Sequence, residues 1–175
     1  MIAQVDELIR ASLTDFAGYL CSTHWSGRRE HEAKSLYAFG HLVPRCRPGH
    51  FLHDPAQIAL DTPVPQIAPE GQKALSRGMR APKRAVAKDL LIWPEPRTTC
   101  WRDGRPSAHP AVIMEWKLNK QGVHPYDVDW LRAFSSDRPD FVGYALTIDL
   151  LRRNALLECT RVHGGEVGVD WFVVR

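Results

Sequence analysis

An apolar run near the middle of the chain is interrupted by two charges of opposite sign, and it constrains the fold more than any other segment. The run reads Ala111-Val-Ile-Met-Glu-Trp-Lys-Leu118. Side chains in a β-strand alternate between two faces, so Glu115 and Lys117 are expected to project from the same side. The opposite side is apolar and carries Val112, Met114, Trp116 and Leu118. Because charge is costly to bury, a strand of this kind needs partners for its two polar side chains.

The Glu-x-Lys triplet is weak evidence when taken alone. The same spacing occurs at Glu32-Ala33-Lys34, in a segment with helical periodicity, and a simple ion pair at a strand end is the default interpretation. A second strand-like run, at residues 85–93, is interrupted by a single acid, Asp89. Turn-forming residues, several of them proline, separate the two runs. Two adjacent strands joined by a long hairpin loop would bring Asp89 beside Glu115 and Lys117.

Asp89, followed by Glu115-Trp116-Lys117, resembles the motif of the PD-(D/E)XK nuclease superfamily, which has the restriction-endonuclease-like fold. In that motif an acid on one strand precedes a (D/E)-x-K triplet on the next. The resemblance covers most of the chain in the order of its elements, but only a few residues in identity. Lys88 stands where the family often has proline. The resemblance implies an α/β fold with a three-layer core, in which helices flank a mixed central sheet.

The resemblance also implies a metal-dependent phosphodiesterase, an endonuclease or exonuclease that uses Mg²⁺ or Mn²⁺. Asp89 and Glu115 are the candidate metal ligands, because hard cations prefer carboxylate oxygens, and the carbonyl of Trp116 is implied as a third ligand. Lys117 would orient the attacking water and stabilise charge in the transition state. Beside two carboxylates, Lys117 should stay protonated until the metal binds, and whether it then acts as a base is left open.

The family often adds an acid from an early helix to these catalytic residues. Glu32 is the first choice, because helical spacing places it on the same face as Leu36, Phe39 and Val43. Glu30 lies on the side of Ala33 and Tyr37 and is the second choice. A solvated acid on a helix surface explains either residue equally well.

Two segments are candidates for binding nucleic acid, with DNA as the expected partner. The loop between the motif strands could stack on bases or grip phosphates through Arg97, Trp101, Arg102 and Arg105. Packing of Trp101 on the sheet is the alternative. The basic stretch at residues 73–84 could follow a phosphate backbone, or it could be an ordinary solvated loop. A homodimer is possible by analogy with family members that cut both strands.

Composition sets broad limits on the protein. A chain of 175 residues is most simply one domain, residues 1–175, and a net charge of +3 neither demands nor excludes nucleic acid. The four cysteines are widely spaced, without a C-x-x-C pair, which predicts free thiols in a reducing compartment. Apolar runs are too short to span a membrane, and the N-terminus carries acids where a secretory signal carries basic residues. A cytoplasmic protein without membrane contact is expected.

Periodicity predicts helices at residues 2–20 and 28–42, and a third that opens at Pro125. Strands are predicted at about 57–61, 85–93, 111–118, 141–150, 155–162 and 167–174. The last two are joined by His163-Gly-Gly-Glu166, which is a hairpin signal. This order fits α/β or α+β, and the resemblance favours α/β.

Two other functions remain open beside the nuclease. The first is a non-catalytic module on the same fold that binds nucleic acid or a protein. The second drops the resemblance: Glu115 and Lys117 would form an ion pair on an edge strand of an unrelated α+β domain, such as an assembly or immunity factor. Fold alone does not decide among them.

Overall fold

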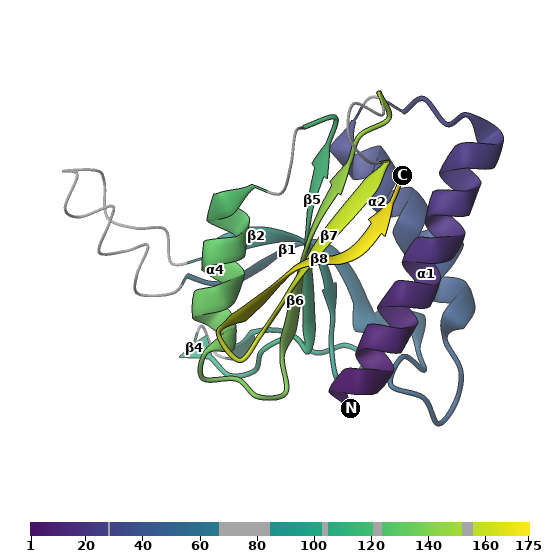
Figure 1. Ribbon diagram of the computed structural model, residues 1–175. Coiled ribbons are helices and arrows are strands. Elements are labelled where there is room, and N and C mark those ends of the chain that lie inside the picture. Colours follow the sequence, from purple (N-terminus) through teal and green to yellow (C-terminus); the bar gives the residue numbers. More distant parts are fainter. Residues whose placement is uncertain (28, 67–84, 103–104, 121–123, 152–155) are drawn as a thin grey trace.

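Six strands form one mixed sheet in the order β1-β2-β5-β6-β7-β8 in the computed structural model, which describes all residues except 28, 67–84, 103–104, 121–123 and 152–155 (Figure 1). The strands are β1 (Ile58–Pro65), β2 (Ala85–Ile92), β5 (Val112–Leu118), β6 (Val142–Ile148), β7 (Leu157–His163) and β8 (Glu166–Val174). Neighbouring strands are antiparallel except β5 and β6, which are parallel. The expected mixed sheet is therefore confirmed, with strand positions close to those predicted.

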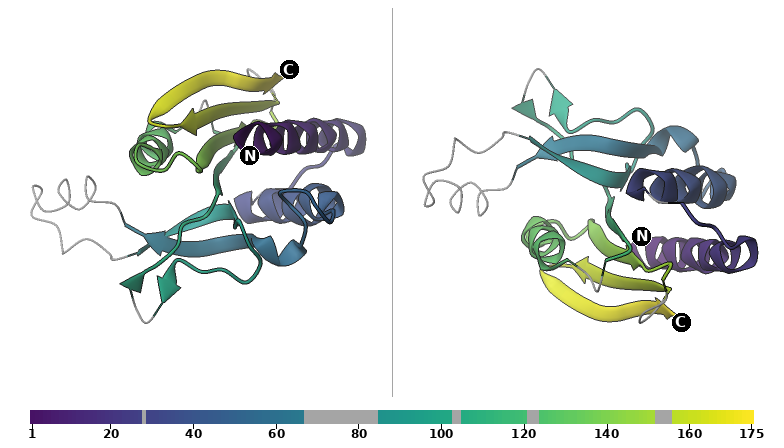
Figure 2. Two further views of the ribbon diagram at one scale, coloured as in Figure 1. Left: turned by 90° about the horizontal axis from the view of Figure 1, so that it is seen from below. Right: turned by 90° about the horizontal axis from the view of Figure 1, so that it is seen from above.

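Helices cover both faces of this sheet, as Figure 2 shows. Helices α1 (Ile2–Thr23) and α2 (Glu30–Tyr37) lie on one face, and α4 (Pro125–Ser135) lies on the other. A parallel pair of strands needs a crossover connection, and α4 supplies it between β5 and β6. The long connection from β2 to β5 carries a short pair of strands, β3 (Trp101–Arg102) and β4 (Arg105–Pro106). The protein thus has a mixed α/β fold.

Strand β5 has one apolar cluster on each side, and the clusters confirm its predicted alternation. Met114 and Trp116 belong to the cluster formed with α1 and α2, together with the buried face of α1. Ile113 belongs to the cluster formed with α4. Glu115 and Lys117 follow Ile113 on the α4 side, which places two charged groups at the edge of an apolar cluster.

The second helix departs from its prediction in both length and orientation. An α-helix over 28–42 was expected, but α2 ends at Tyr37 and continues as a π-helical turn (Ala38–Leu42) and a 3₁₀ turn (Val43–Arg45). The expected apolar face is wrong: Phe39 is 67 % exposed, while Ala33, Lys34 and Tyr37 are buried. Ala33, Lys34 and Tyr37 lie in the regular part of α2, so the buried face differs from the predicted one before the π turn begins at Ala38. The π turn then shifts the side chains that follow it.

The regular alternation of side chains along β2 is interrupted near the middle of the strand. Residues before and after this point therefore face opposite sides of the sheet from those expected, and the polar site lies at the interruption. Val86 packs against the α4-side cluster, whereas Leu90 packs in the cluster on the opposite face. In a regular strand these two residues would share a face. The change occurs around Asp89, and its opposite neighbour in β1, Asp61, has a positive φ of 49°. Lys88 thereby points to the α4 side, where its ammonium lies over the Trp130 ring.

Two further expectations concern the whole chain. All four cysteines are free thiols. Within the described residues, no helix combines the length and the apolar character needed to cross a membrane. The basic stretch at residues 73–84 lies outside the described residues.

Candidate functional site

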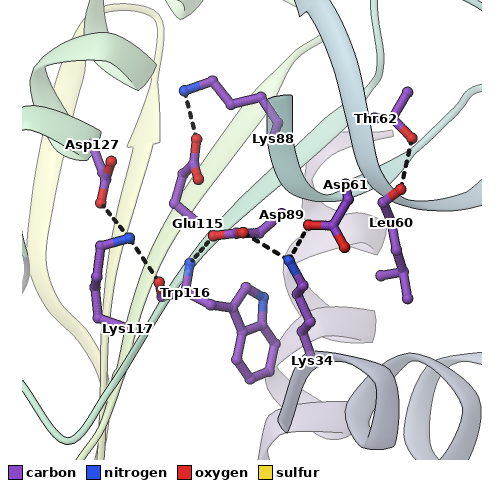
Figure 3. Close-up of polar contacts among 10 residues, drawn as sticks. All are labelled: Lys34, Leu60, Asp61, Thr62, Lys88, Asp89, Glu115, Trp116, Lys117 and Asp127. Atoms are coloured by element: carbon purple, nitrogen blue, oxygen red, sulfur yellow. Dashed lines mark hydrogen bonds and ion pairs between the residues drawn. The ribbon is translucent and has the colours of Figure 1, made fainter. Parts of the chain in front are cut away.

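The candidate site lies where β2 and β5 separate. Strands β2 and β5 pair from Ile92–Val112 to Leu90–Met114, so within the described structure the rest of β5 has no strand partner on the edge that faces β2. Side-chain carboxylates accept the backbone hydrogen bonds of β5 there. The Trp116 N–H donates to Asp89 Oδ2 at 2.9 Å (Figure 3). The backbone of Leu118 hydrogen-bonds to Glu30. A buried N–H group needs an acceptor, so the open strand edge itself recruits two acids.

Asp89 and Glu115 come together in this split, as the motif predicted. Burial raises the pKa of Asp89, but hydrogen bonds from Lys34 and from the Trp116 N–H, the Lys34 charge and a hydrogen bond from Glu115 together hold it below its usual range. Burial raises the pKa of Glu115 to about 7, against the opposing effect of Lys88. Two close carboxyl groups cannot both ionise easily, so near neutral pH the pair shares a proton, held mainly by Glu115.

Buried lysines accompany both carboxyl groups. Lys34 of α2 donates to Asp89 Oδ1 at 2.9 Å and also pairs with Asp61 of β1. Lys88 of β2 places its Nζ 2.5 Å from Glu115 Oε1. Both lysine side chains are almost fully buried, so their ammonium groups depend on these partners.

Lys117 lies on the same strand edge and is anchored from two sides. Its Nζ donates to the Trp116 carbonyl at 2.8 Å and lies 3.2 Å from Asp127 Oδ2 in the first turn of α4. Burial lowers the pKa of Lys117, but the charges of Asp127 and Glu30 outweigh burial and raise it. Lys117 is therefore an ammonium with a fixed position in the free protein.

The geometry contradicts one structural expectation, the simple ion pair between Glu115 and Lys117 on an edge strand. Strand β5 lies inside the sheet between β2 and β6. Glu115 and Lys117 pair with different partners, Lys88 and Asp127, from different elements. The two charges therefore belong to a network that joins α2, β1, β2, β5 and α4.

The helix acid that approaches this network is Glu30, the second choice. Burial raises the pKa of Glu30, and the charges of Lys117, Asp89 and Lys34 all act on it. Glu32, the first choice, instead accepts a hydrogen bond from the Arg29 N–H at the start of α2. Glu30 lies on the buried side of α2, which is the side the predicted apolar face missed.

The structure does not bring the predicted nucleic-acid residues next to the carboxyl pair. Arg97 and Arg102 are exposed in the β2–β5 connection, which begins where Ile92 pairs with Val112, at the opposite end of β5 from Lys117. This connection carries β4 in Figure 1. Trp101 packs partly against the α4-side cluster, and Arg105 begins β4. A cavity of about 650 Å³ lies there, between residues 106–109 and the end of α4. This end of the protein is thus a separate surface.

Four site residues were missed from the sequence: Lys34, Lys88, Asp61 and Asp127. Lys34 is one helical turn after Glu30, and this spacing was an available signal. Asp127 lies in the first turn of the third helix, where an acid is ordinary and does not indicate a site. Lys88 and Asp61 gave no usable signal, because regular alternation places Lys88 away from Glu115 and the reversal of the hairpin is a tertiary feature.

The donor set fits a hard divalent cation only in part. Two carboxyl groups and the Trp116 carbonyl offer oxygen ligands of the kind that Mg²⁺ and Mn²⁺ prefer. Glu115 Oε1 is buried and already has the Lys88 Nζ at 2.5 Å, so a divalent cation would have to bind beside the lysine. In addition, no group of three His, Cys, Asp or Glu side chains in the described ranges is arranged to hold a metal. Remaining ligands would have to come from the backbone or water.

Comparisons of the chain with protein-family models, with curated proteins and with solved structures find no match. The function of the site has to be inferred from the chemistry of its own residues.

Proposed function

We propose that the protein is a metal-dependent phosphodiesterase, a nuclease of the PD-(D/E)XK type. The observation that carries this proposal is the meeting of Asp89 and Glu115 in the split between two adjacent strands, with the Lys117 ammonium on the same edge. A divalent cation would replace the proton that the two carboxyl groups share. The order of the elements supports the proposal: a helix, a meander of three strands, a crossover helix and a strand parallel to the third.

Each residue has a distinct role in this proposal. Asp89, Glu115 and the Trp116 carbonyl would hold Mg²⁺ or Mn²⁺. When bound, the cation supplies Lewis acidity and lowers the pKa of a bound water. Lys117 remains an ammonium because Asp127 and Glu30 raise its pKa, so it stabilises negative charge on the phosphate instead of removing a proton from water. The substrate proposed is nucleic acid, with DNA as the first choice.

The test is cleavage of single- and double-stranded DNA and RNA with Mg²⁺, with Mn²⁺ and with EDTA. Asp89→Asn, Glu115→Gln and Lys117→Met should each lower the rate roughly hundredfold or more, because each removes a charge that acts on the phosphate or its cation. Glu32→Gln is the matched control and should retain activity, since its carboxyl group serves the start of α2. Equal cleavage by wild type and the three site variants would exclude the assignment.

A non-catalytic module is the second candidate, and one observation favours it. Every motif charge already has a partner within the chain: Asp89 with Lys34, Glu115 with Lys88, and Lys117 with Asp127. Such a network could serve only to join the helices to the sheet, while an outer surface binds nucleic acid or a protein. Calorimetric titration with Mn²⁺ separates the two functions: an absence of binding, together with DNA retained in a gel-shift assay, would favour the module.

A further inference from the structure

Lys88 is the most unusual charged residue of the site, because its side chain is only 2 % exposed. Its Nζ lies 2.5 Å from Glu115 Oε1 and 3.6 Å from the centroid of the Trp130 ring. A carboxylate and the face of an indole are the two groups that attract a desolvated cation most strongly. Glu115 and Trp130 therefore form a cation-binding position, and the Lys88 ammonium occupies it.

The Lys88 ammonium lies directly against one carboxyl oxygen of Glu115. The Nζ–Oε1 distance is 2.5 Å, and both the charge of Lys88 and its hydrogen bond act to lower the pKa of Glu115. The lysine thus occupies one oxygen of Glu115 with a fixed positive charge. Glu115 also hydrogen-bonds to Asp89 on its other side. One buried carboxyl group therefore lies between a fixed cation and the position proposed for a divalent cation.

We propose that the Lys88 ammonium acts as a resident counter-cation, which stabilises the ionised form of Glu115 in the metal-free protein and sets a low affinity for the divalent cation. This inference rests on the proposed function, because it concerns the same carboxyl pair. Like charges in a buried site repel strongly, so a cation at Asp89 and Glu115 has to bind against the field of Lys88. In return, Lys88 keeps the site folded when no metal is present.

The test compares Mn²⁺ affinity in wild type, Lys88→Gln and Lys88→Arg by isothermal titration calorimetry. A glutamine is neutral and can donate to Glu115, so the carboxyl group keeps a partner. Lys88→Gln should bind Mn²⁺ roughly tenfold more tightly or better, because the repulsion is removed. Lys88→Arg keeps the charge and should bind like wild type. Lys120→Gln, an exposed lysine, is the control for net charge.

Thermal unfolding with Mn²⁺ and with EDTA gives a second readout that does not depend on cleavage. Lys88→Gln should unfold at a lower temperature than wild type in EDTA and gain more from Mn²⁺, because tighter binding stabilises the folded state more. Lys88→Met, which can pack on Trp130, repeats the test if the glutamine variant does not fold. The gain should vanish when Glu115→Gln is added to either variant.

The possible results separate this inference from the proposed function. Binding of Mn²⁺ by wild type and Lys88→Gln with equal affinity would overturn the role of Lys88 and leave the metal site standing. Binding by Lys88→Gln alone would support the role of Lys88 and contradict a metal-dependent function of the wild type. An absence of binding in both would overturn both proposals.

Discussion

Replacing Lys34 with methionine tests the network at its most central ion pair. The Lys34 side chain is 5 % exposed, and its ammonium serves Asp89 and Asp61 together. Methionine keeps most of the packing of the alkyl chain but removes the charge. Among the described residues, the largely buried Asp89 carboxylate would then keep the Trp116 N–H and Glu115 as partners. We expect the free energy of unfolding to fall.

The magnitude follows from how exposed the two partners are. Removing one member of a buried ion pair costs about 3–5 kcal/mol, because the other charge is left uncompensated. The Asp89 side chain is 17 % exposed and keeps a backbone donor, so loss of its pair with Lys34 should lower the free energy of unfolding by about 2–3 kcal/mol. Asp61 is 63 % exposed and should add less than about 1 kcal/mol. The double variant Lys34→Met/Asp89→Asn should recover at least half of the loss.

Urea unfolding at several pH values is the appropriate assay, with Lys120→Met as the exposed control. The folded pKa of Asp89 is held below its ordinary value of 3.8. Its stabilisation is therefore present above pH 3.8 and lost as the pH falls through the folded pKa. Since Lys34 helps to lower that pKa, the loss in Lys34→Met should be largest near neutral pH and shrink in acid. A loss below about 1 kcal/mol, or one independent of pH, would refute the importance of the Lys34–Asp89 pair.

Three further predictions address the pH response, the helix acid and the packing of the sheet. The pKa of Glu115 is raised from 4.5 to about 7, so the free energy of unfolding of the wild type should fall by up to about 3 kcal/mol as the pH rises across this range. Urea unfolding of Glu115→Gln should show no such dependence on pH. Glu30→Gln should slow cleavage roughly tenfold, whereas Glu32→Gln should not, because glutamine serves equally well at that capping position; equal rates would exclude Glu30 from the site. Gly143→Ala should destabilise the protein by about 1–3 kcal/mol, because its Cβ would lie 2.8 Å from a side chain of α4, while Gly18→Ala, with open space around it, should not.

The sequence was sufficient for most of the fold because its strands and helices carry clear periodic patterns. In α1 the apolar spacing from Val5 to Leu20 corresponds to the buried face, and β5 alternates as expected. The failure in α2 lies in the choice of its buried face, because Lys34 is buried through ion pairs with acids from other elements while Phe39 is exposed. Local patterns thus predict elements well, but they miss a face that is buried through charge pairs and a backbone that departs from regular geometry.

The candidate site was only partly predictable, for the same reason. The convergence of Asp89 and Glu115 followed from the antiparallel pairing of two strands, which a hairpin connection makes natural. The partners Lys34 and Lys88 depend on a reversal of the β1–β2 hairpin at Asp61, and no pattern of alternation contains that reversal. Aspartate tolerates a positive φ better than most residues, but Asp61 does not stand out among the other acids in the chain.

The balance of charge around the split is an independent argument for a bound cation. The carboxyl groups of the network are Glu30, Asp61, Asp89, Glu115 and Asp127, and the ammonium groups are Lys34, Lys88 and Lys117. Five acids against three lysines leave two negative charges in excess when every group is ionised, and one of the two is solvated because Asp61 is 63 % exposed. A network that only joined elements would be most stable with its charges matched, because each unmatched buried charge carries a desolvation cost. The raised pKa of Glu115 offsets the buried part of this excess with a proton, and a divalent cation at the carboxyl pair would take the place of that proton.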